Sequence, residues 1–426
     1  MKKLIYFLLL LPLVWIDSSC RDQCTETRTS RRYVPITLTA EQVRKGVSVE
    51  AARALTKPGK IYTKDGYLLI NEVKEGIHII DNRDPTAPKF VAFLRIPGNG
   101  DMAIRDNVLY ADSYMDLVAL DISDPRAIRE VNRVQNVFTR GTFEGGSWSF
   151  NQQNVTLSDM RIDYVTETVK TNCEGTSNIY SGWYGGVSFA YDSRVSSAPS
   201  AALPATNGVA GSMARFALYQ DFLYTVGQTD MQLFDIKTPT APRASSRVNL
   251  GTAIETVFPY KDKLFIGSQS GMLIYDNANP AQPVRMSVFQ HARVCDPVVV
   301  NGDIAYVTLR SGNTCGGFTN QLDVVNVKDL FNPKLLKSYP MINPHGLGVD
   351  FPNLFIAEGA SGLKSFDATD PLNVTQLQYL SGMDSYDVIP LGKTLLMIGK
   401  DGLYQYDYTN PGQMRLLSKL SVASPY

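Results

Sequence analysis

One short pattern recurs seven times along this chain and constrains its fold more than any other feature. In each copy, alternating apolar residues run up to an Asp or Asn, and a short polar stretch follows, usually ending in Pro; the copies read GIHIIDNRDPTAP (residues 76–88), LVALDISDP, MQLFDIKTPTAP, MLIYDNANPAQP, LDVVNVKDLFNP, LKSFDATDP and LYQYDYTNP. Alternation predicts a half-buried strand. The Asp can accept backbone N–H bonds that start a turn, and Pro has no donor to continue a ladder. Each copy therefore predicts a strand and its stop signal.

The spacing of the copies predicts the architecture. Their anchor residues lie roughly 40 residues apart, with one wide gap, at Asp81, Asp121, Asp235, Asp276, Asn326, Asp367 and Asp407. A second apolar run precedes each copy, as in GYLLINE (66–72) and DKLFIGS (262–268), and shorter runs flank the pair. Four short strands in a period near 40 are typical of a propeller blade. The sequence thus predicts an all-β fold, a seven-bladed β-propeller of four-stranded blades over residues 57–426, with an insertion after the second blade.

The repeats resemble the LVIVD-repeat proteins of bacterial cell surfaces. The pattern behind that name is visible here as IHIID, LVALD and MLIYD, and the resemblance covers nearly all of the chain after about residue 57. It implies a propeller, commonly on an exported lipoprotein, and it supplies no agreed reaction and no catalytic residues. Asn326 departs from the Asp of the pattern, but Asn can make the same turn.

The first 19 residues read as an export signal. Lys2 and Lys3 precede an apolar run, residues 4–16, which is shorter than the roughly 20 residues needed to span a bilayer. Ser18-Ser19-Cys20 is similar to a bacterial lipobox, although Asp17 is unusual there. Acylation of Cys20 would hold the mature protein on a membrane. The expected location is the bacterial cell envelope, at the outer membrane or the cell surface.

Residues 20–56 are predicted to form a tether or a clasp lying against the last blade. Within them, Thr39-Ala40-Glu41-Gln42 has the form of a capping box, and Gly46 is placed to end the short helix. A clasp would matter physically because an unjoined seam in the ring leaves two exposed strand edges.

Five cysteines fit an exported chain. If Cys20 takes lipid, four remain, and disulfides are expected in an oxidising compartment. The entry to the innermost strand of the fifth unit and the loop between its second and third strands share one face of a propeller. A Cys295–Cys315 disulfide is therefore predicted, and Cys24–Cys173 is the leftover pairing.

The wide gap, residues 139–211, is predicted to be an excursion of strands or a hairpin that projects from the rim. It contains GTFEGGSW (141–148), an alternating run at 154–165, the aromatic residues Tyr180, Trp183 and Tyr184, and a Ser/Ala/Pro-rich tail. Trp183 and Tyr184 are candidates for recognising a sugar or protein partner. The alternative is that these aromatic residues form the insertion's own small core.

Charge and motif content exclude several functions. Lys plus Arg and Asp plus Glu each number 41, and no basic stripe occurs, so nucleic acid is not expected as a partner. The chain has three histidines and neither a His-Glu-x-x-His motif nor a ligand pair at helical spacing, so no resident metal is predicted.

Propeller topology gathers certain loops at one mouth of the central channel. These loops enter the innermost strands or join second to third strands, and they carry Lys60, Asp101, Ser212, Arg215, Glu255, Asp296, His345, Asp384 and Asp387. The ligand-binding candidates are Asp101, Arg215, Glu255, Asp296, His345, Asp384 and Asp387, together with Trp183 and Tyr184. No cofactor is predicted; Ca²⁺ is the cation that such carboxylates would take. The alternative is a wet channel mouth without a ligand.

Two classes of function follow from these features. The first is a membrane-anchored, non-enzymatic binding or scaffold protein that presents the propeller mouth and the insertion to an envelope protein or polysaccharide. The second is a hydrolase or lyase at the mouth, with or without assistance from a metal ion, with His345, Asp296, Glu255 and Asp384 as the acid and base candidates. We favour the first because fold alone does not grant activity.

Overall fold

The computed structural model describes residues 23–143, 146–172, 209–210, 214–251, 254–269, 271–291, 297–311 and 319–423. Within this part of the chain, regular structure is almost entirely β, with one short helix, α1 (Ala40–Arg44). The strands form eight sheets, seven of which carry the repeated motif on strands that follow one another in sequence. The predicted all-β fold is confirmed.

The strands of the first four motif-bearing sheets are β3 (Pro58–Lys64), β4 (Tyr67–Glu72), β5 (Gly76–Asp81) and β6 (Lys89–Arg95); β7 (Met102–Arg105), β8 (Val108–Ser113), β9 (Asp116–Asp121) and β10 (Arg129–Val134); β15 (Phe216–Tyr219), β16 (Phe222–Val226), β17 (Asp230–Asp235) and β18 (Arg243–Asn249); and β19 (Ile254–Tyr260), β20 (Lys263–Ser268), β21 (Gly271–Asp276) and β22 (Val284–Gln290). The first sheet gains β14 (Val209–Ala210) beside β3 and β2 (Ser48–Glu50) beside β6.

The strands of the last three are β23 (Val298–Asn301), β24 (Ile304–Leu309), β25 (Gln321–Asn326) and β26 (Lys334–Pro340); β27 (Leu347–Asp350), β28 (Asn353–Ala357), β29 (Leu363–Asp367) and β30 (Thr375–Leu380); and β31 (Ser385–Leu391), β32 (Thr394–Gly399), β33 (Gly402–Asp407) and β34 (Arg415–Ser421). The eighth sheet has the order β1 (Gln23–Thr39), β13 (Thr156–Asn172), β12 (Gly146–Asn151) and β11 (Arg140–Phe143). The predicted excursion between residues 139 and 211 thus contains β11, β12, β13 and β14 among its described residues.

The chain divides into two compact units. One consists of residues 1–34 and 161–188, and the other of residues 35–160 and 189–426. In the first unit, the described residues are the opposed parts of β1 and β13, joined by contacts such as Thr29 with Thr166 and Arg32 with Asp163. The residue numbers on β13 fall as those on β1 rise, so the two strands run antiparallel.

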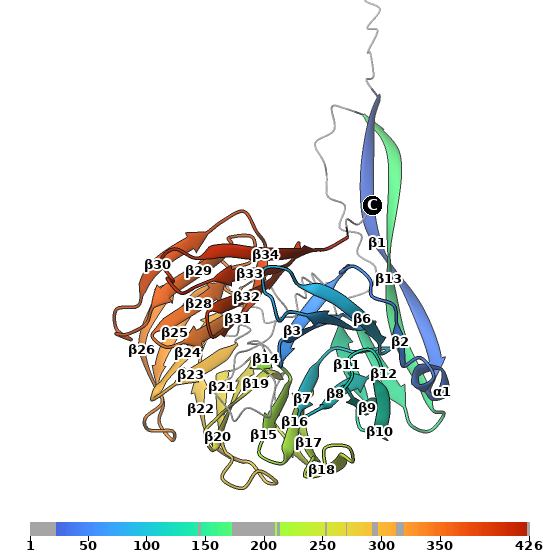
Figure 1. The fold of residues 1–426 in the computed structure, drawn as a ribbon, viewed down its shortest axis with the longest axis horizontal. Coiled ribbons are helices and arrows are strands. Elements are labelled where there is room, and N and C mark those ends of the chain that lie inside the picture. Colours follow the sequence, from blue (N-terminus) through green and yellow to red (C-terminus); the bar gives the residue numbers. More distant parts are fainter. Residues whose placement is uncertain are drawn as a thin grey trace, which may run out of the picture. The chain divides into compact units, whose positions relative to one another are not determined.

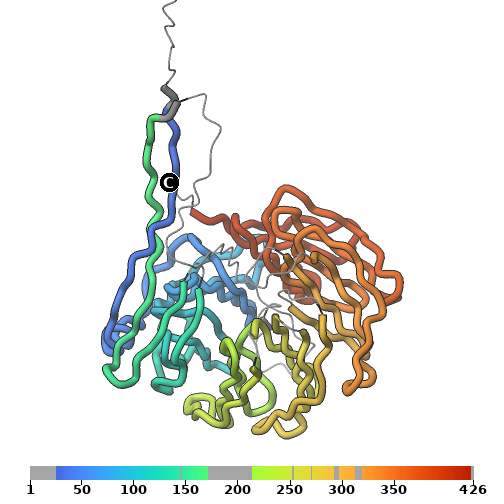
Figure 2. The backbone as a smooth tube through the Cα atoms, turned by 180° about the vertical axis from the view of Figure 1, so that it is seen from behind, coloured from blue at the N-terminus to red at the C-terminus, as the bar shows by residue number. Residues whose placement is uncertain are grey.

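The second unit contains the ring of motif-bearing sheets. The first strand of each sheet contacts the first strand of the next, in the order β3, β7, β15, β19, β23, β27 and β31, and β32 returns to β3. Figures 1 and 2 show these sheets set around a central axis, with the chain's colours running around it from blue to red. Residues distant in sequence therefore meet near the axis.

The anchor residue of every motif makes the turn that the sequence predicts. In all seven copies, its side-chain oxygen Oδ1 accepts the backbone N–H two residues later, at 2.8–3.2 Å. Asn326 does so as the aspartates do, accepting from Lys328 at 2.9 Å. The prediction for these turns, including the departure at Asn326, is confirmed.

Buried tyrosines tie neighbouring sheets together. Tyr110, Tyr224 and Tyr306 occupy equivalent places in the second strands of three sheets and are almost fully buried. Each hydroxyl donates to a backbone carbonyl in the motif loop of the following sheet: Pro239 for Tyr110, Pro280 for Tyr224 and Ala368 for Tyr306. The apolar cores fill the joints between the sheets around them. The repeats thus supply both the sheets and the contacts between them.

The ring closes without a strand shared between its first and last sheets. The side-chain amides of Asn82 and Gln405 bond each other in both directions, at 2.9 and 2.6 Å. Ser418 donates to the carbonyl of Pro85 at 2.6 Å. Leu55 forms a parallel bridge with Val422, and the N–H of Ala423 donates to Leu55 at 2.7 Å. N-terminal residues therefore lie along the seam at the last sheet.

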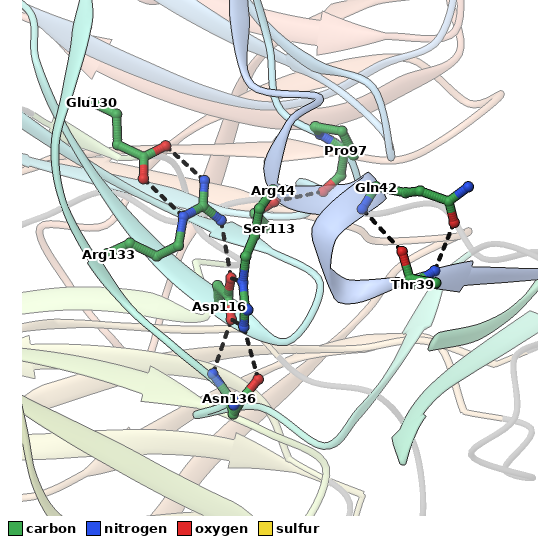
Figure 3. Close-up of polar contacts among 9 residues, drawn as sticks. All are labelled: Thr39, Gln42, Arg44, Pro97, Ser113, Asp116, Glu130, Arg133 and Asn136. Atoms are coloured by element: carbon green, nitrogen blue, oxygen red, sulfur yellow. Dashed lines mark hydrogen bonds and ion pairs between the residues drawn. The ribbon is translucent and has the colours of Figure 1, made fainter. Parts of the chain in front are cut away.

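Helix α1 is held on the second sheet by a buried carboxylate (Figure 3). Asp116 is fully buried and pairs with Arg44 at 2.8 Å and Arg133 at 3.0 Å. The predicted capping box is confirmed, because Thr39 Oγ1 accepts from the N–H of Gln42 while the Gln42 side chain accepts from the N–H of Thr39. What the sequence did not predict is the long strand β1 before this helix, which pairs with the insertion.

Candidate functional site

A solvent-accessible cavity of about 100 Å³ lies where the first three sheets meet the insertion. Its charged lining consists of Lys60, Asp101, Asp112, Arg140 and Arg215. Its other lining residues are Val73, Gly100, Tyr114, Phe138, Gly141, Thr142, Phe143, Trp148, Phe216, Thr225, Val226 and Gly227. This cavity is lined by three of the residues predicted at the channel mouth, Lys60, Asp101 and Arg215.

Lys60, Asp101 and Arg215 come together as the topology predicts. Lys60 lies on β3, and the other two immediately precede β7 and β15. The Lys60 ammonium is 2.5 Å from Asp101 Oδ2, and the two side chains are 2% and 5% exposed. Asp101 also accepts the backbone N–H groups of Arg215 and Phe216, at 2.5 and 3.2 Å. Asp101 therefore joins three sheets at one point, and its carboxylate is fully used in doing so.

Burial and charge act in opposite directions on Lys60. Burial lowers the pKa of its ammonium, and the nearby Arg215 guanidinium lowers it further, whereas the Asp101 carboxylate raises it. The net direction is downward. The pairing with Asp101 thus compensates only part of the cost of removing the Lys60 charge from water.

Asp112 is the most strongly perturbed carboxyl of the cavity. Its Oδ1 accepts three hydrogen bonds, from Asn99 Nδ2 and from the N–H groups of Gly100 and Asp101, at 2.7–2.9 Å. Among the described residues, no donor reaches Oδ2. Burial raises the pKa of Asp112 to about 6 in spite of the backbone N–H bonds that lower it, and the neighbouring Asp101 charge adds to the rise. Asp112 is therefore poised to change charge between pH 5 and 7.

Replacement of Asp112 by Asn tests this reading of the site. Because the folded-state pKa is raised, the stability contributed by the neutral carboxyl is present below about pH 4 and is lost as the pH rises through about 6. Asn keeps an oxygen for the three donors and carries no charge. We expect Asp112→Asn to be more stable than the parent by about 3 kcal/mol at pH 8 and nearly equal to it at pH 4. Urea unfolding at both pH values measures this difference.

The exposed Asp106 in the next turn provides the control for that experiment. Asp106→Asn removes one carboxylate from the exposed surface and is unfolded beside the parent at the same two pH values. An Asp112→Asn variant whose advantage is the same at pH 4 and pH 8 would contradict the assignment of the titration to Asp112.

The insertion supplies an aromatic wall to the cavity. Phe143 on β11 and Trp148 on β12 are 7% and 5% exposed, and Tyr114 meets both rings edge-on, with centroid separations of 6.2 and 5.5 Å. A Cβ at Gly141 would overlap the indole nitrogen of Trp148, so glycine permits this close approach. Only Tyr114 of these residues comes from a motif-bearing sheet's own loops, so the insertion completes the site.

A second group of predicted residues lies at the joint between the sixth and seventh sheets. His345 is 1% exposed, and the Asp387 carboxylate packs against Gly346, where a Cβ would overlap it. His345 Nε2 is 3.2 Å from Arg310 Nη1. A guanidinium can only donate, so Nε2 accepts and the imidazole is neutral. A general-base role for Nε2 would require Arg310 to release it.

The remaining predicted residues are dispersed or lie outside the described part of the chain. Glu255 is half-buried on β19, and Asp384 is half-buried just before β31, where its carbonyl accepts the N–H of Lys400. Residues outside the description, in whole or in their side chains, are Cys20, Cys24, Cys173, Trp183, Tyr184, Ser212, Cys295, Asp296 and Cys315. The lipid anchor, both disulfides and three ligand candidates therefore stay predictions.

The described residues contain no group of three or more His, Cys, Asp or Glu side chains placed to hold a metal ion. No helix in the same part of the chain is long and apolar enough to cross a membrane.

Sequence reasoning missed Asp112, Arg140 and Phe143 as site residues. A signal for Asp112 was present, since the second strands of the other repeats have Asn71, Val226, Gly267, Thr308, Ala357 and Ile398 at its position. An ionisable residue in one repeat, at a strand position that is uncharged in all the others, indicates that packing alone does not explain the residue there. Arg140 and Phe143 carried no such signal, because the insertion has no second copy for comparison.

The fold, though not the sequence, is shared with solved structures. The computationally designed Ika8 protein is similar with a TM-score of 0.51 and 8% identity, over 87% of this chain and 91% of that one. A protein from Lactobacillus plantarum has a TM-score of 0.50 and 13% identity, over 86% of this chain and 96% of that one. Sqt1 from Saccharomyces cerevisiae has a TM-score of 0.50 and 9% identity, over 87% of this chain and 86% of that one. At these identities the likeness shows the fold alone, and the β-propeller prediction is confirmed. No protein-family model and no curated protein matches the sequence.

Proposed function

We propose that this chain is an exported, lipid-anchored binding protein of the bacterial envelope, similar to the LVIVD-repeat surface proteins, that holds its partner at the cavity between the first three sheets and the insertion. The partner would be an envelope protein or a polysaccharide. Binding without catalysis is the simplest function for a charged, aromatic-lined hollow on a repeat scaffold.

The observation that carries this proposal is the composition of the cavity wall. The propeller supplies Lys60, Asp101, Asp112 and Arg215, and the insertion supplies Arg140, Phe143 and Trp148. Insertions on a rigid scaffold are where recognition residues tend to be placed. Anchorage is supported by the Ser18-Ser19-Cys20 sequence after the apolar run. The propeller-like neighbours add that this fold is a common scaffold for binding.

Arg215 is the side chain whose loss should harm binding most. Its Nε donates to the carbonyl of Val226 at 3.1 Å, and its terminal nitrogens have no partner among the described residues. We expect Arg215→Gln to weaken capture of the envelope partner about tenfold or more, because a charged hydrogen bond to a ligand is worth roughly 1.5–3 kcal/mol. The measurement is a pull-down of envelope polysaccharides and proteins by the mature chain carrying Cys20→Ser.

Arg243 offers a matched control on the third sheet. It is exposed at the start of β18, far along the strand order from the cavity-lining β15. Arg243→Gln should bind as the parent does, which separates a specific effect from loss of one positive charge. Equal binding by Arg215→Gln and the parent would exclude this cavity as the binding site.

A further inference from the structure

The cavity carries an excess of positive charge. Three cationic side chains, Lys60, Arg140 and Arg215, line it together with two carboxylates, Asp101 and Asp112. Lys60 and Asp101 neutralise each other at 2.5 Å. The charges that remain are those of Arg140, Arg215 and Asp112. A small anion is therefore the ligand that the balance of charge favours.

Two groups in this hollow have hydrogen-bonding capacity that the described residues do not use. The terminal nitrogens of Arg215 have no acceptor, although its Nε is occupied by Val226. Asp112 Oδ2 has no donor, although Oδ1 has three. A guanidinium fork matches a carboxylate in a bidentate way, and a lone carboxyl oxygen matches a hydroxyl. The pair thus suits a ligand that bears both a carboxylate and a hydroxyl group.

The volume of the cavity and its aromatic lining narrow the class of ligand further. A volume of about 100 Å³ equals roughly three water molecules at about 30 Å³ each, enough for a carboxylate and its adjoining atoms. The rest of a ring would lie against Phe143 and Trp148, which also line the hollow. Rings with an apolar face and polar edges pack well on aromatic side chains.

We propose that the cavity binds the carboxylate-bearing sugar of an acidic polysaccharide, with Arg215 holding the carboxylate, Asp112 accepting from a hydroxyl group, and Phe143 and Trp148 packing against the ring. This inference rests on the proposed binding function and specifies its ligand. The carboxylate end of a peptide would satisfy Arg215 but would leave the hydroxyl acceptor Asp112 without a purpose.

The proposal includes a dependence on pH. An ionised Asp112 repels the ligand's carboxylate, and the raised pKa of Asp112 means that this repulsion disappears below about pH 6. The charged or titratable groups that face Asp112 from the surrounding elements are Lys60, Asp101, Tyr114, Arg140 and Arg215. The affinity for a uronate should therefore fall as the pH rises from 5 to 7.5.

Titration calorimetry of the mature chain carrying Cys20→Ser tests the ligand class with three probes. We expect glucuronic acid to bind at least tenfold more tightly than glucose and than N-acetyl-Ala-Ala, which offers a peptide carboxylate. Arg215→Gln should lose at least tenfold in affinity for glucuronic acid, and Arg243→Gln should lose none. Between pH 5 and 7.5 the parent should weaken about fivefold, whereas Asp112→Asn should stay constant.

The outcomes separate this inference from the proposed function. Equal affinity for glucose and glucuronic acid, preference for the peptide probe, or an unchanged affinity in Arg215→Gln would overturn the acidic-sugar assignment. If the envelope pull-down still depends on Arg215 in that case, the ligand class alone is wrong. If the pull-down is also insensitive to Arg215, the binding site itself is wrong.

Discussion

Replacing Lys60 by Met should destabilise the protein by about 3–5 kcal/mol. The Asp101 carboxylate would stay buried without the ammonium of Lys60, which is 2.5 Å away, and the two side chains are 5% and 2% exposed. Asp101 cannot leave its position, because it also accepts the N–H groups of Met102, Arg215 and Phe216. The midpoint of urea unfolding at pH 7 measures the loss.

The same strand supplies the control. Lys64 also pairs with an aspartate, but its partner Asp65 is 67% exposed, so Lys64→Met should cost less than about 1 kcal/mol. A double variant, Lys60→Met with Asp101→Asn, should be more stable than Lys60→Met alone because Asn keeps one acceptor oxygen for the backbone N–H groups and removes the unpaired charge. Equal stabilities of Lys60→Met and Lys64→Met would show that the buried pair contributes little.

Replacing Glu72 by Ala should cost about 3–5 kcal/mol and release the N-terminal segment from the first sheet. Glu72 is 1% exposed and accepts from Thr56 Oγ1 at 2.7 Å, from Thr56 N–H at 3.1 Å and from the N–H of Lys57, and it lies 2.7 Å from His78 Nε2. All of these groups would lose their partner at once. Urea unfolding gives the global loss, and hydrogen exchange at the Thr56 and Lys57 amides reports the local release.

The pH dependence of this effect follows from the direction of the pKa shift. Burial alone would raise the pKa of Glu72, but hydrogen bonds from His78 and Thr56 outweigh it and lower the pKa. The stability that Glu72 contributes is therefore present at neutral pH and is lost as the pH falls through its lowered pKa. Glu75→Ala is the control, because Glu75 is 56% exposed and pairs with Arg53 at the surface. Its cost should stay below about 1 kcal/mol.

The repeats made much of the fold predictable. Seven copies of one strand-and-turn pattern act as an internal alignment, so the turn at Asp81 could be transferred to Asn326 without further information. The same reasoning placed Lys60, Asp101 and Arg215 at one mouth, although 41 and 114 residues separate Asp101 from its two partners. Closed topology fixes which loops converge even before any contact is known.

Features outside the repeat were not predictable in this way. The pairing of β1 with β13 depends on a register between two strands that occur once each, so no second copy was available for comparison. Residues 20–56 looked like either a tether or a clasp, and the structure shows pairing with the insertion, a helix held by Asp116 and a bridge from Leu55 to Val422. Such arrangements arise from tertiary packing, which single-sequence patterns do not encode.

The seam between the first and last sheets has a consequence for how the ring can be cut. The four motif strands of each sheet follow one another in sequence, and among the described residues the seam is joined by side chains, a short bridge and the amide pair of Asn82 and Gln405. The polypeptide could thus be spliced across this joint and given new ends at another junction without separating the four motif strands of any sheet. The ring should therefore tolerate circular permutation, with the chain beginning at a different sheet.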